Sequence, residues 1–586
     1  MKNFIERFLN KDIFVLAFIF LCLMIAFSPS FLFDYFRHDD WASACWDRVA
    51  INTHHLFQNS VVNEFRPYTM IFIYYSELFT EYLSGAKFVK IGSIIILSIS
   101  SLFFYKWLKI FNVNSLWALF LSVMLFVLPP MQIMASTYQY FFMVVPILLC
   151  SVTLLVMWDI NNKNYNNINS IFAFILFIQF LTIITLYPLF ILYGLIVSAF
   201  FIFLYYTYRK SNSDKNANRF LYASAFIIYF TAITAYPMSA MFVWFLLAVP
   251  LLLMIKAHNR KEIINFCLKV FTFSAATMVI YFLLGRIFAY VLGIDTDHAR
   301  GMSISSDLSK IFYHTIDAFR ISSNLWDIKE YFVTGKFFLD YNSLIVIITS
   351  FIAALCINNK LHYKNFKLPL LIFCFTSSLV FFTIAPLVLS NNGASMYRYL
   401  IALTPLIGFI FLYSLSIIYL YIVPKIKYEK YFTGTLLASS FIFMIYLSNQ
   451  TLLHNIVIPN QYEMDYISDI LDEKVIPKIK NNEKVVIHHV QGKVNYTRNR
   501  YSLDEYSVSM TVFKWPVLAQ FVMLLKDSNI NTLSRACFPS KWEPNHGVFK
   551  LNWGTLELFT NPAVQKENSV NKDYILIDMD KLDYID

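Results

Sequence analysis

Long apolar runs recur along most of this 586-residue chain, and they constrain its fold more than any other feature. They follow one another between Asp12 and Asn449, and several reach the length of about 18 residues or more that a helix needs to cross a bilayer. Hydrophobic residues make up 58% of the chain and charged residues only 14%. The first run, 13–33, is too long for a removable signal peptide and lacks a small-residue cleavage site. The sequence therefore predicts an α-helical polytopic membrane protein.

The apolar runs predict thirteen spanning helices. Their expected ranges are 12–33, 88–108, 115–131, 138–157, 168–186, 189–208, 220–236, 238–256, 265–292, 343–357, 368–389, 399–423 and 431–449. After Asn449 the composition becomes polar, with a helical stretch near Tyr462–Ile479 and β-like runs at Val485–Ile487 and Tyr574–Ile577. We therefore expect a membrane module at 1–449 and a small external α/β domain at 450–586, which is long enough for its own core.

Basic residues indicate the orientation of these helices. With the N-terminus inside, nineteen lysines and arginines fall in the cytoplasmic segments, but the opposite short loops hold only Arg37, Arg48, Arg66, Lys87 and Arg398. Cytoplasmic loops are enriched in these residues. The asymmetry predicts external loops at 34–87 and 293–342 and an external C-terminal domain. Because topology accounts for the net charge of +10, the charge does not indicate nucleic-acid binding.

The first external loop is expected to hold two helices that lie along the membrane, at 41–59 and 66–84. In the second, polar residues such as Thr69 and Glu77 recur at helical spacing on one face, and aromatic residues such as Phe72 and Phe79 lie on the other. The predicted topology requires that 66–84 does not span, because otherwise every later loop would change sides.

An acidic pair, Asp39 and Asp40, follows the first predicted span in the sequence Arg37-His38-Asp39-Asp40-Trp41. Adjacent carboxylates resist ionising together where water is scarce, so a membrane border is a costly place for them. In the functional interpretation, one carboxylate is the general base for an acceptor hydroxyl, and the other orients that hydroxyl or binds a cation. In the alternative, the pair is solvated or pairs with Arg37.

Arg66 is expected at the start of the second interfacial helix, directly before Pro67. The positive end of a helix dipole disfavours a cation there, and a bound anion such as a lipid phosphate would remove the conflict. A salt bridge to Asp39, Asp40 or Glu64 is the alternative.

Two further arginines lie near predicted external helix ends. Arg398, in Met396-Tyr397-Arg398-Tyr399, is expected to enter a long helix, where it either snorkels to water or contacts a phosphate or substrate. Arg286 is a weaker phosphate candidate near the end of another apolar run.

Three tyrosines, Tyr138, Tyr140 and Tyr236, also lie at predicted external helix ends. They either form a platform for a sugar or belong to the aromatic belt of the membrane interface. No spacing of cysteine and histidine indicates a metal site.

In their order and their shared side of the membrane, these features resemble the GT-C glycosyltransferases, which are polytopic membrane enzymes. More narrowly, Asp39-Asp40-Trp41, Phe65-Arg66-Pro67 and Met396-Tyr397-Arg398-Tyr399 look like motifs of the bacterial serotype-converting O-antigen glucosyltransferases. The resemblance covers the architecture of about residues 12–450. Residues 450–586 resemble no family.

The resemblance implies an inverting transferase of the bacterial inner membrane that acts on the external leaflet. Its donor would be a polyprenyl-phosphate sugar, with glucose as the expected sugar, and its acceptor a surface glycan such as O-antigen. Asp39 or Asp40 would deprotonate the acceptor hydroxyl, while Arg66 and Arg398 would stabilise the departing phosphate. No cofactor is expected, although a divalent metal could replace part of the arginines' role.

Two other classes remain open. An O-antigen polymerase or ligase is also multi-spanning, but it would not need an early acidic pair. A transporter or flippase of lipid-linked glycans would bury charges midway through its helices, and the predicted spans here are nearly free of acids.

Overall fold

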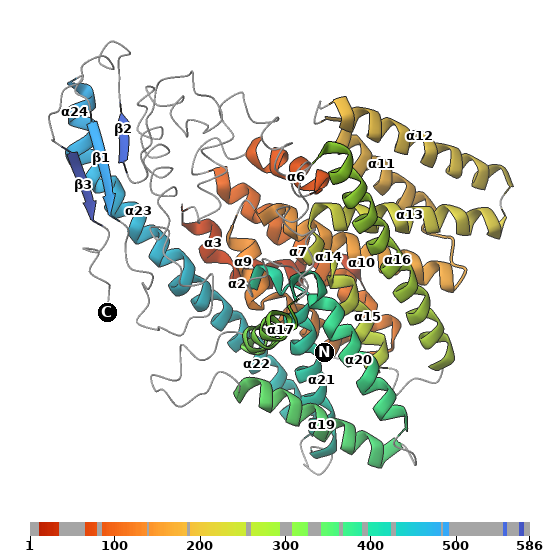
Figure 1. The fold of residues 1–586 in the computed structure, drawn as a ribbon. Coiled ribbons are helices and arrows are strands. Elements are labelled where there is room, and N and C mark those ends of the chain that lie inside the picture. Colours follow the sequence, from red (N-terminus) through yellow and green to blue (C-terminus); the bar gives the residue numbers. More distant parts are fainter. Residues whose placement is uncertain are drawn as a thin grey trace.

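The structure is a computed structural model of the chain (Figure 1). The residues that it describes are 11–33, 35, 65–78, 85–137, 140–184, 188–211, 213–253, 260–293, 307–325, 342–362, 367–388, 397–422, 429–481, 485–490, 555–558 and 574–578. Most of them are helical. The structure therefore agrees with the predicted α-helical class.

The helices of the first half are α2 (Asp12–Ala26), α3 (Ser28–Leu32), α6 (Pro67–Leu78), α7 (Ala86–Ile110), α8 (Ser115–Phe126), α9 (Pro129–Ser136), α10 (Phe141–Asn161), α11 (Ile168–Ile184), α12 (Pro188–Ser211), α13 (Asp214–Ala235), α14 (Pro237–Ala240) and α15 (Phe242–Leu253). Those of the second half are α16 (Arg260–Leu292), α17 (Leu308–Ser323), α19 (Asn342–His362), α20 (Lys367–Val388), the 3₁₀ turn η6 (Tyr397–Tyr399), α21 (Leu403–Ile422), α22 (Glu429–Leu452), the π-helical turn η8 (Leu453–Val457), α23 (Ile458–Ile470), the π-helical turn η9 (Leu471–Val475) and α24 (Ile476–Lys480).

Several helices are long and apolar enough to cross a membrane. Among the described residues there are five such helices, or six if one bent pair counts as a span. The five are Ala86–Ile110, Phe141–Asn161, Ile191–Lys210, Lys261–Val291 and Gly434–Lys478. Shorter apolar helices accompany them, such as Leu403–Tyr419. The count of thirteen spans stays a prediction.

The surface of α12 is typical of a helix that faces lipid. Leu195, Ile196, Phe200 and Phe203 on this helix are each at least half exposed. A contiguous apolar surface of this kind is unfavourable in water. Helices α11 and α12 lie side by side at one edge of the bundle (Figure 1), and the exposed apolar residues fit a position in contact with the bilayer.

The predicted span 115–131 is broken in the structure. Helix α8 ends at Phe126, and α9 continues from Pro129 with its axis bent by 60°. Proline lacks a backbone N–H and is tolerated at the first turn of a helix but not in its interior, so Pro129 and Pro130 begin a new helix. The prediction of one continuous helix here is wrong.

Aromatic rings join four helices in the core. Trp107 of α7, Trp158 of α10 and Phe266 of α16 pack with ring centroids 5.0–5.7 Å apart. The indole nitrogen of Trp107 donates a hydrogen bond to the carbonyl of Leu246 on α15 at 3.0 Å. Aromatic pairs contribute about 0.5–1.5 kcal/mol each beyond burial, so this cluster joins the C-terminal ends of α7 and α10 to the N-terminal part of α16.

Helix α6 packs against the bundle through its first turns. Residues 68–73 are buried, and the helix contacts α10 and α13. Thr69, which the helical pattern assigned to a polar face, is itself buried, and its hydroxyl donates to the carbonyl of Ala235 at the end of α13. The polar face predicted for this helix is therefore not exposed at Thr69, because the neighbouring helix supplies the acceptor.

The last predicted span does not end at Asn449. The helix continues through two π-helical turns to Lys480, a length of about 78 Å at 1.5 Å per residue. Asn449 lies inside it and donates to the carbonyl of Ile25 at 2.8 Å and to the hydroxyl of Ser28 at 2.9 Å. The structure thus joins the predicted span to the helical stretch predicted near Tyr462–Ile479.

This long helix leads to a three-stranded sheet (Figure 1). The strands are β1 (Val485–Val490), β2 (Thr555–Leu558) and β3 (Tyr574–Asp578), in the order β2-β1-β3. Strand β1 is antiparallel to β2 and parallel to β3. The two predicted β-like runs lie in β1 and β3, and strand β2 was not predicted.

Candidate functional site

The residue before Arg66 has an unusual backbone. Phe65 has a φ of +50°, in the left-handed region that bulky residues rarely adopt. Its ring packs against Tyr281 and Phe288 of α16, with centroids 5.6 and 5.3 Å away. These contacts hold Phe65 in this turn, and the turn fixes the position of Arg66 at the entrance to α6.

Arg66 lies over the face of Tyr236. The guanidinium carbon is 5.2 Å from the centroid of the Tyr236 ring, which is buried. Tyr236 is extended, as expected before Pro237, and its ring meets Phe142 of α10 edge-on at 5.5 Å. An arginine stacked on a tyrosine keeps N–H groups at its edge that can bind a carboxylate or phosphate. The alternative partners Asp39, Asp40 and Glu64 lie outside the described residues.

Arg398 has the same kind of partner. It donates a hydrogen bond to the hydroxyl of Tyr140, and its guanidinium carbon lies 5.7 Å from the Tyr140 ring and 5.1 Å from the Tyr399 ring. Arg398 is half-buried. It was expected to enter a helix from residue 399, but it lies in the 3₁₀ turn η6, and α21 begins only at Leu403.

The turn that carries Arg398 is anchored on both sides. Tyr397 is fully buried, and its hydroxyl accepts a hydrogen bond of 3.4 Å from the side-chain amide of Asn324, just after α17. Helix α9 also packs against η6. The guanidinium of Arg398 is therefore presented by a fixed turn.

Both arginine–tyrosine pairs are attached to the start of α10. Arg66 stacks on Tyr236, and Tyr236 contacts Phe142, which lies two residues from Tyr140 at the start of α10. Tyr140 in turn binds Arg398. We call these five residues the arginine–tyrosine rim. Four residues that were predicted separately thus form two pairs at the start of α10, Arg66 with Tyr236 and Arg398 with Tyr140.

Arg286 is not joined to the rim by these contacts. Its guanidinium carbon lies 5.3 Å from the ring of Phe282, one turn earlier on the same helix. At 100° per residue, Arg286 points about 150° away from the face of α16 that carries Tyr281 and Phe288. The helix therefore directs Arg286 away from Phe65 and Arg66.

Lys90 was missed in the sequence analysis. It lies within the predicted span 88–108 and is buried, with 1% of its surface exposed. Its ammonium donates to the backbone carbonyl of Tyr35 at 2.8 Å and lies 3.6 Å from the centroid of the Tyr35 ring. The signal was available, because a lysine in the first turns of an apolar helix is costly to bury without partners.

Three predicted site residues, Asp39, Asp40 and Tyr138, lie outside the described residues. Their roles stay predictions. Within the described part of the chain, no group of three or more His, Cys, Asp or Glu side chains is arranged to hold a metal ion.

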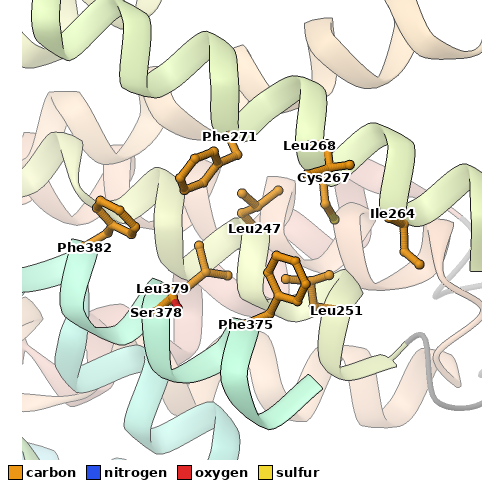
Figure 2. Close-up of a pocket in the computed structure, with 10 residues that line it drawn as sticks. All are labelled: Leu247, Leu251, Ile264, Cys267, Leu268, Phe271, Phe375, Ser378, Leu379 and Phe382. Atoms are coloured by element: carbon orange, nitrogen blue, oxygen red, sulfur yellow. The ribbon is translucent and has the colours of Figure 1, made fainter. Parts of the chain in front are cut away.

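A cavity of about 260 Å³ lies between α15, α16 and α20. Its lining is almost entirely apolar, and Figure 2 shows Phe271, Phe382 and Leu247 directed toward it. Its residues on α15, Leu247 and Leu251, lie at the middle of that helix and in the half farther from Tyr236. Because the lining offers no acid, base or cation, the cavity is suited to hydrocarbon and not to catalysis.

A comparison with protein-family models, curated proteins and solved structures finds no match for this chain.

Proposed function

We propose that this chain is an inverting glycosyltransferase of a bacterial inner membrane. It moves a sugar, with glucose as the expected one, from a polyprenyl-phosphate donor in the bilayer to a surface glycan such as O-antigen. The proposed topology has thirteen spans, a cytoplasmic N-terminus and an external α/β domain at 450–586.

The reaction breaks one bond and forms another at the anomeric carbon of the donor sugar. The acceptor hydroxyl oxygen attacks this carbon from the side opposite the phosphate, so the configuration inverts. Its proton passes to the carboxylate of Asp39 or Asp40, and the bond between the sugar and the phosphate oxygen breaks. Polyprenyl phosphate leaves with the bonding electrons.

The observation that supports this proposal is the arginine–tyrosine rim. A departing phosphate gains negative charge in the transition state, and preorganised cations that face it can contribute several kcal/mol to catalysis. Arg66 and Arg398 are each held against a buried tyrosine ring, so little reorganisation is needed when the charge develops. Two cations from elements far apart in the sequence then act on one leaving group without a metal.

The experiment is sugar transfer from a polyprenyl-phosphate donor to extracted surface glycan, with the parent, Asp39→Asn and Asp40→Asn. We expect transfer by the parent and its loss in one variant that still inserts at the parental level. Full transfer by both variants would contradict the base assignment and favour a polymerase or a transporter. A parent that transfers no sugar would contradict the proposed function.

A further inference from the structure

Lys90 is among the largest fully buried side chains in the described part of the chain. A buried ammonium loses the hydration that it has in water, so it persists in a folded protein only where partners replace water. Here the carbonyl of Tyr35 accepts a hydrogen bond from the ammonium at 2.8 Å, and the Tyr35 ring lies beneath it at 3.6 Å. Both contacts strengthen in a site without water.

Tyr35 is held at a second point as well. Its hydroxyl donates to the carbonyl of Ser136 at 3.2 Å, and the whole residue is buried. Ser136 is the last residue of α9, the helix that packs against the turn carrying Arg398. Lys90 of α7 thus holds the backbone of Tyr35, while α9 holds its hydroxyl.

We propose that Lys90 is a positioning residue for the transfer reaction, and that it acts by fixing Tyr35 relative to the arginine–tyrosine rim. This inference rests on the proposed function. Asp39 follows Tyr35 by four positions, a reach of at most about 14 Å. Tyr35 is the described residue nearest in sequence to the acidic pair, and α9 links it to the turn that carries Arg398.

The test compares three lysine variants in the full-length protein. Lys90→Met removes the charge and the hydrogen bond but keeps a side chain of similar length, whereas Lys90→Arg keeps a cation and its donors. The matched control is Lys87→Met, which removes the same charge three residues earlier from a half-buried position on the same helix. Tyr35→Phe is a milder variant, because it removes only the hydroxyl that donates to Ser136.

The kinetic readout separates positioning from binding. Small displacements of a catalytic group can lower the rate by about 100-fold, so we expect a fall in kcat of that order for Lys90→Met with little change in KM. Lys90→Arg should regain most of the loss, and Tyr35→Phe should lose about 10-fold. Lys87→Met should resemble the parent.

A distance measurement tests whether Lys90 fixes Tyr35, and it needs no glycosyl transfer. Spin labels are placed on cysteines introduced at His38 and at Phe88, which is 63% exposed. The native cysteines that a label could reach are replaced by serine: Cys356, which is exposed, and Cys45 and Cys537, which lie in polar stretches of the sequence. The distance distribution should broaden in Lys90→Met and stay as in the parent in Lys90→Arg and Lys87→Met.

An unchanged distance distribution in Lys90→Met would overturn the inference. A broadened distance distribution together with an unchanged kcat would overturn it as well. If the parent transfers no sugar, the proposed function fails, and the distance measurement alone then decides whether Lys90 fixes this part of the chain.

Discussion

Replacing Tyr140 by phenylalanine removes one oxygen atom from the arginine–tyrosine rim and keeps the aromatic ring. In the parent, Arg398 donates a hydrogen bond to this hydroxyl and also lies over the ring, with its guanidinium carbon 5.7 Å from the centroid. The contact with the ring survives in Tyr140→Phe. The variant therefore isolates what the hydrogen bond contributes to holding Arg398.

The size of the effect follows from the charge and the burial. A hydrogen bond to a charged group contributes about 1.5–3 kcal/mol, and Tyr140 is only 5% exposed, so water does not readily replace the lost acceptor. If Arg398 must be held for the leaving phosphate, the loss raises the transition-state barrier. We expect kcat/KM to fall by between about 10-fold and about 150-fold, because each 1.36 kcal/mol corresponds to tenfold.

The assay is the initial rate of transfer from a polyprenyl-phosphate donor, with equal amounts of inserted protein. Tyr205→Phe on α12 is a matched control, because Arg209 donates to the Tyr205 hydroxyl at 3.0 Å and lies 5.4 Å from its ring. The same oxygen is thus removed from the same kind of pair outside the rim. Equal rates for Tyr140→Phe and Tyr205→Phe would refute the role given to Arg398.

Two further predictions concern stability. Thr69→Val should lower the free energy of unfolding by about 1 kcal/mol, because it leaves the buried Ala235 carbonyl without its donor. Thermal unfolding in detergent measures this loss, and Thr272→Val, at an exposed threonine, is the control. Equal losses of stability in the two variants would contradict the prediction. The hydroxyl of Ser309, followed by the backbone amides of Lys310 and Ser309, lowers the pKa of Asp307 at the N-terminus of α17. The ionised carboxylate therefore stabilises the fold at neutral pH, and this contribution is lost as the pH falls below about 4. The difference in Tm between the parent and Asp307→Ala should narrow on acidification, and a difference that widens would show that another group is responsible.

The length and position of most helices could be predicted from the sequence, because an apolar run of membrane-spanning length leaves the backbone few alternatives. Helices α10, α16 and α20 each begin or end within a few residues of the predicted ranges. The predictions fail where the composition of a segment does not indicate its structure. The helix continues past Asn449 although its residues become more polar, because Met464, Ile467 and Ile470 recur at helical spacing and bury one face.

The pairing of the site residues could not be predicted. Arg398 and Tyr140 are 258 positions apart, and no local pattern connects them. Their contact depends on how α9 and α10 pack against η6, which is a property of the tertiary structure. Lys90 was missed for a related reason: a single lysine in an apolar run was counted as part of a span, and its partner Tyr35 lies on another segment.

In the proposed reaction, Arg66 and Arg398 act on the same leaving phosphate. The most direct measurement is the kcat of sugar transfer for Arg66→Gln and Arg398→Gln, compared with Arg209→Gln, which removes an arginine stacked on a tyrosine outside the rim. Loss of a preorganised group that stabilises developing charge lowers kcat by about 100-fold or more. We predict such a loss in both rim variants and a rate near that of the parent in Arg209→Gln. Rim variants as active as Arg209→Gln would contradict the account.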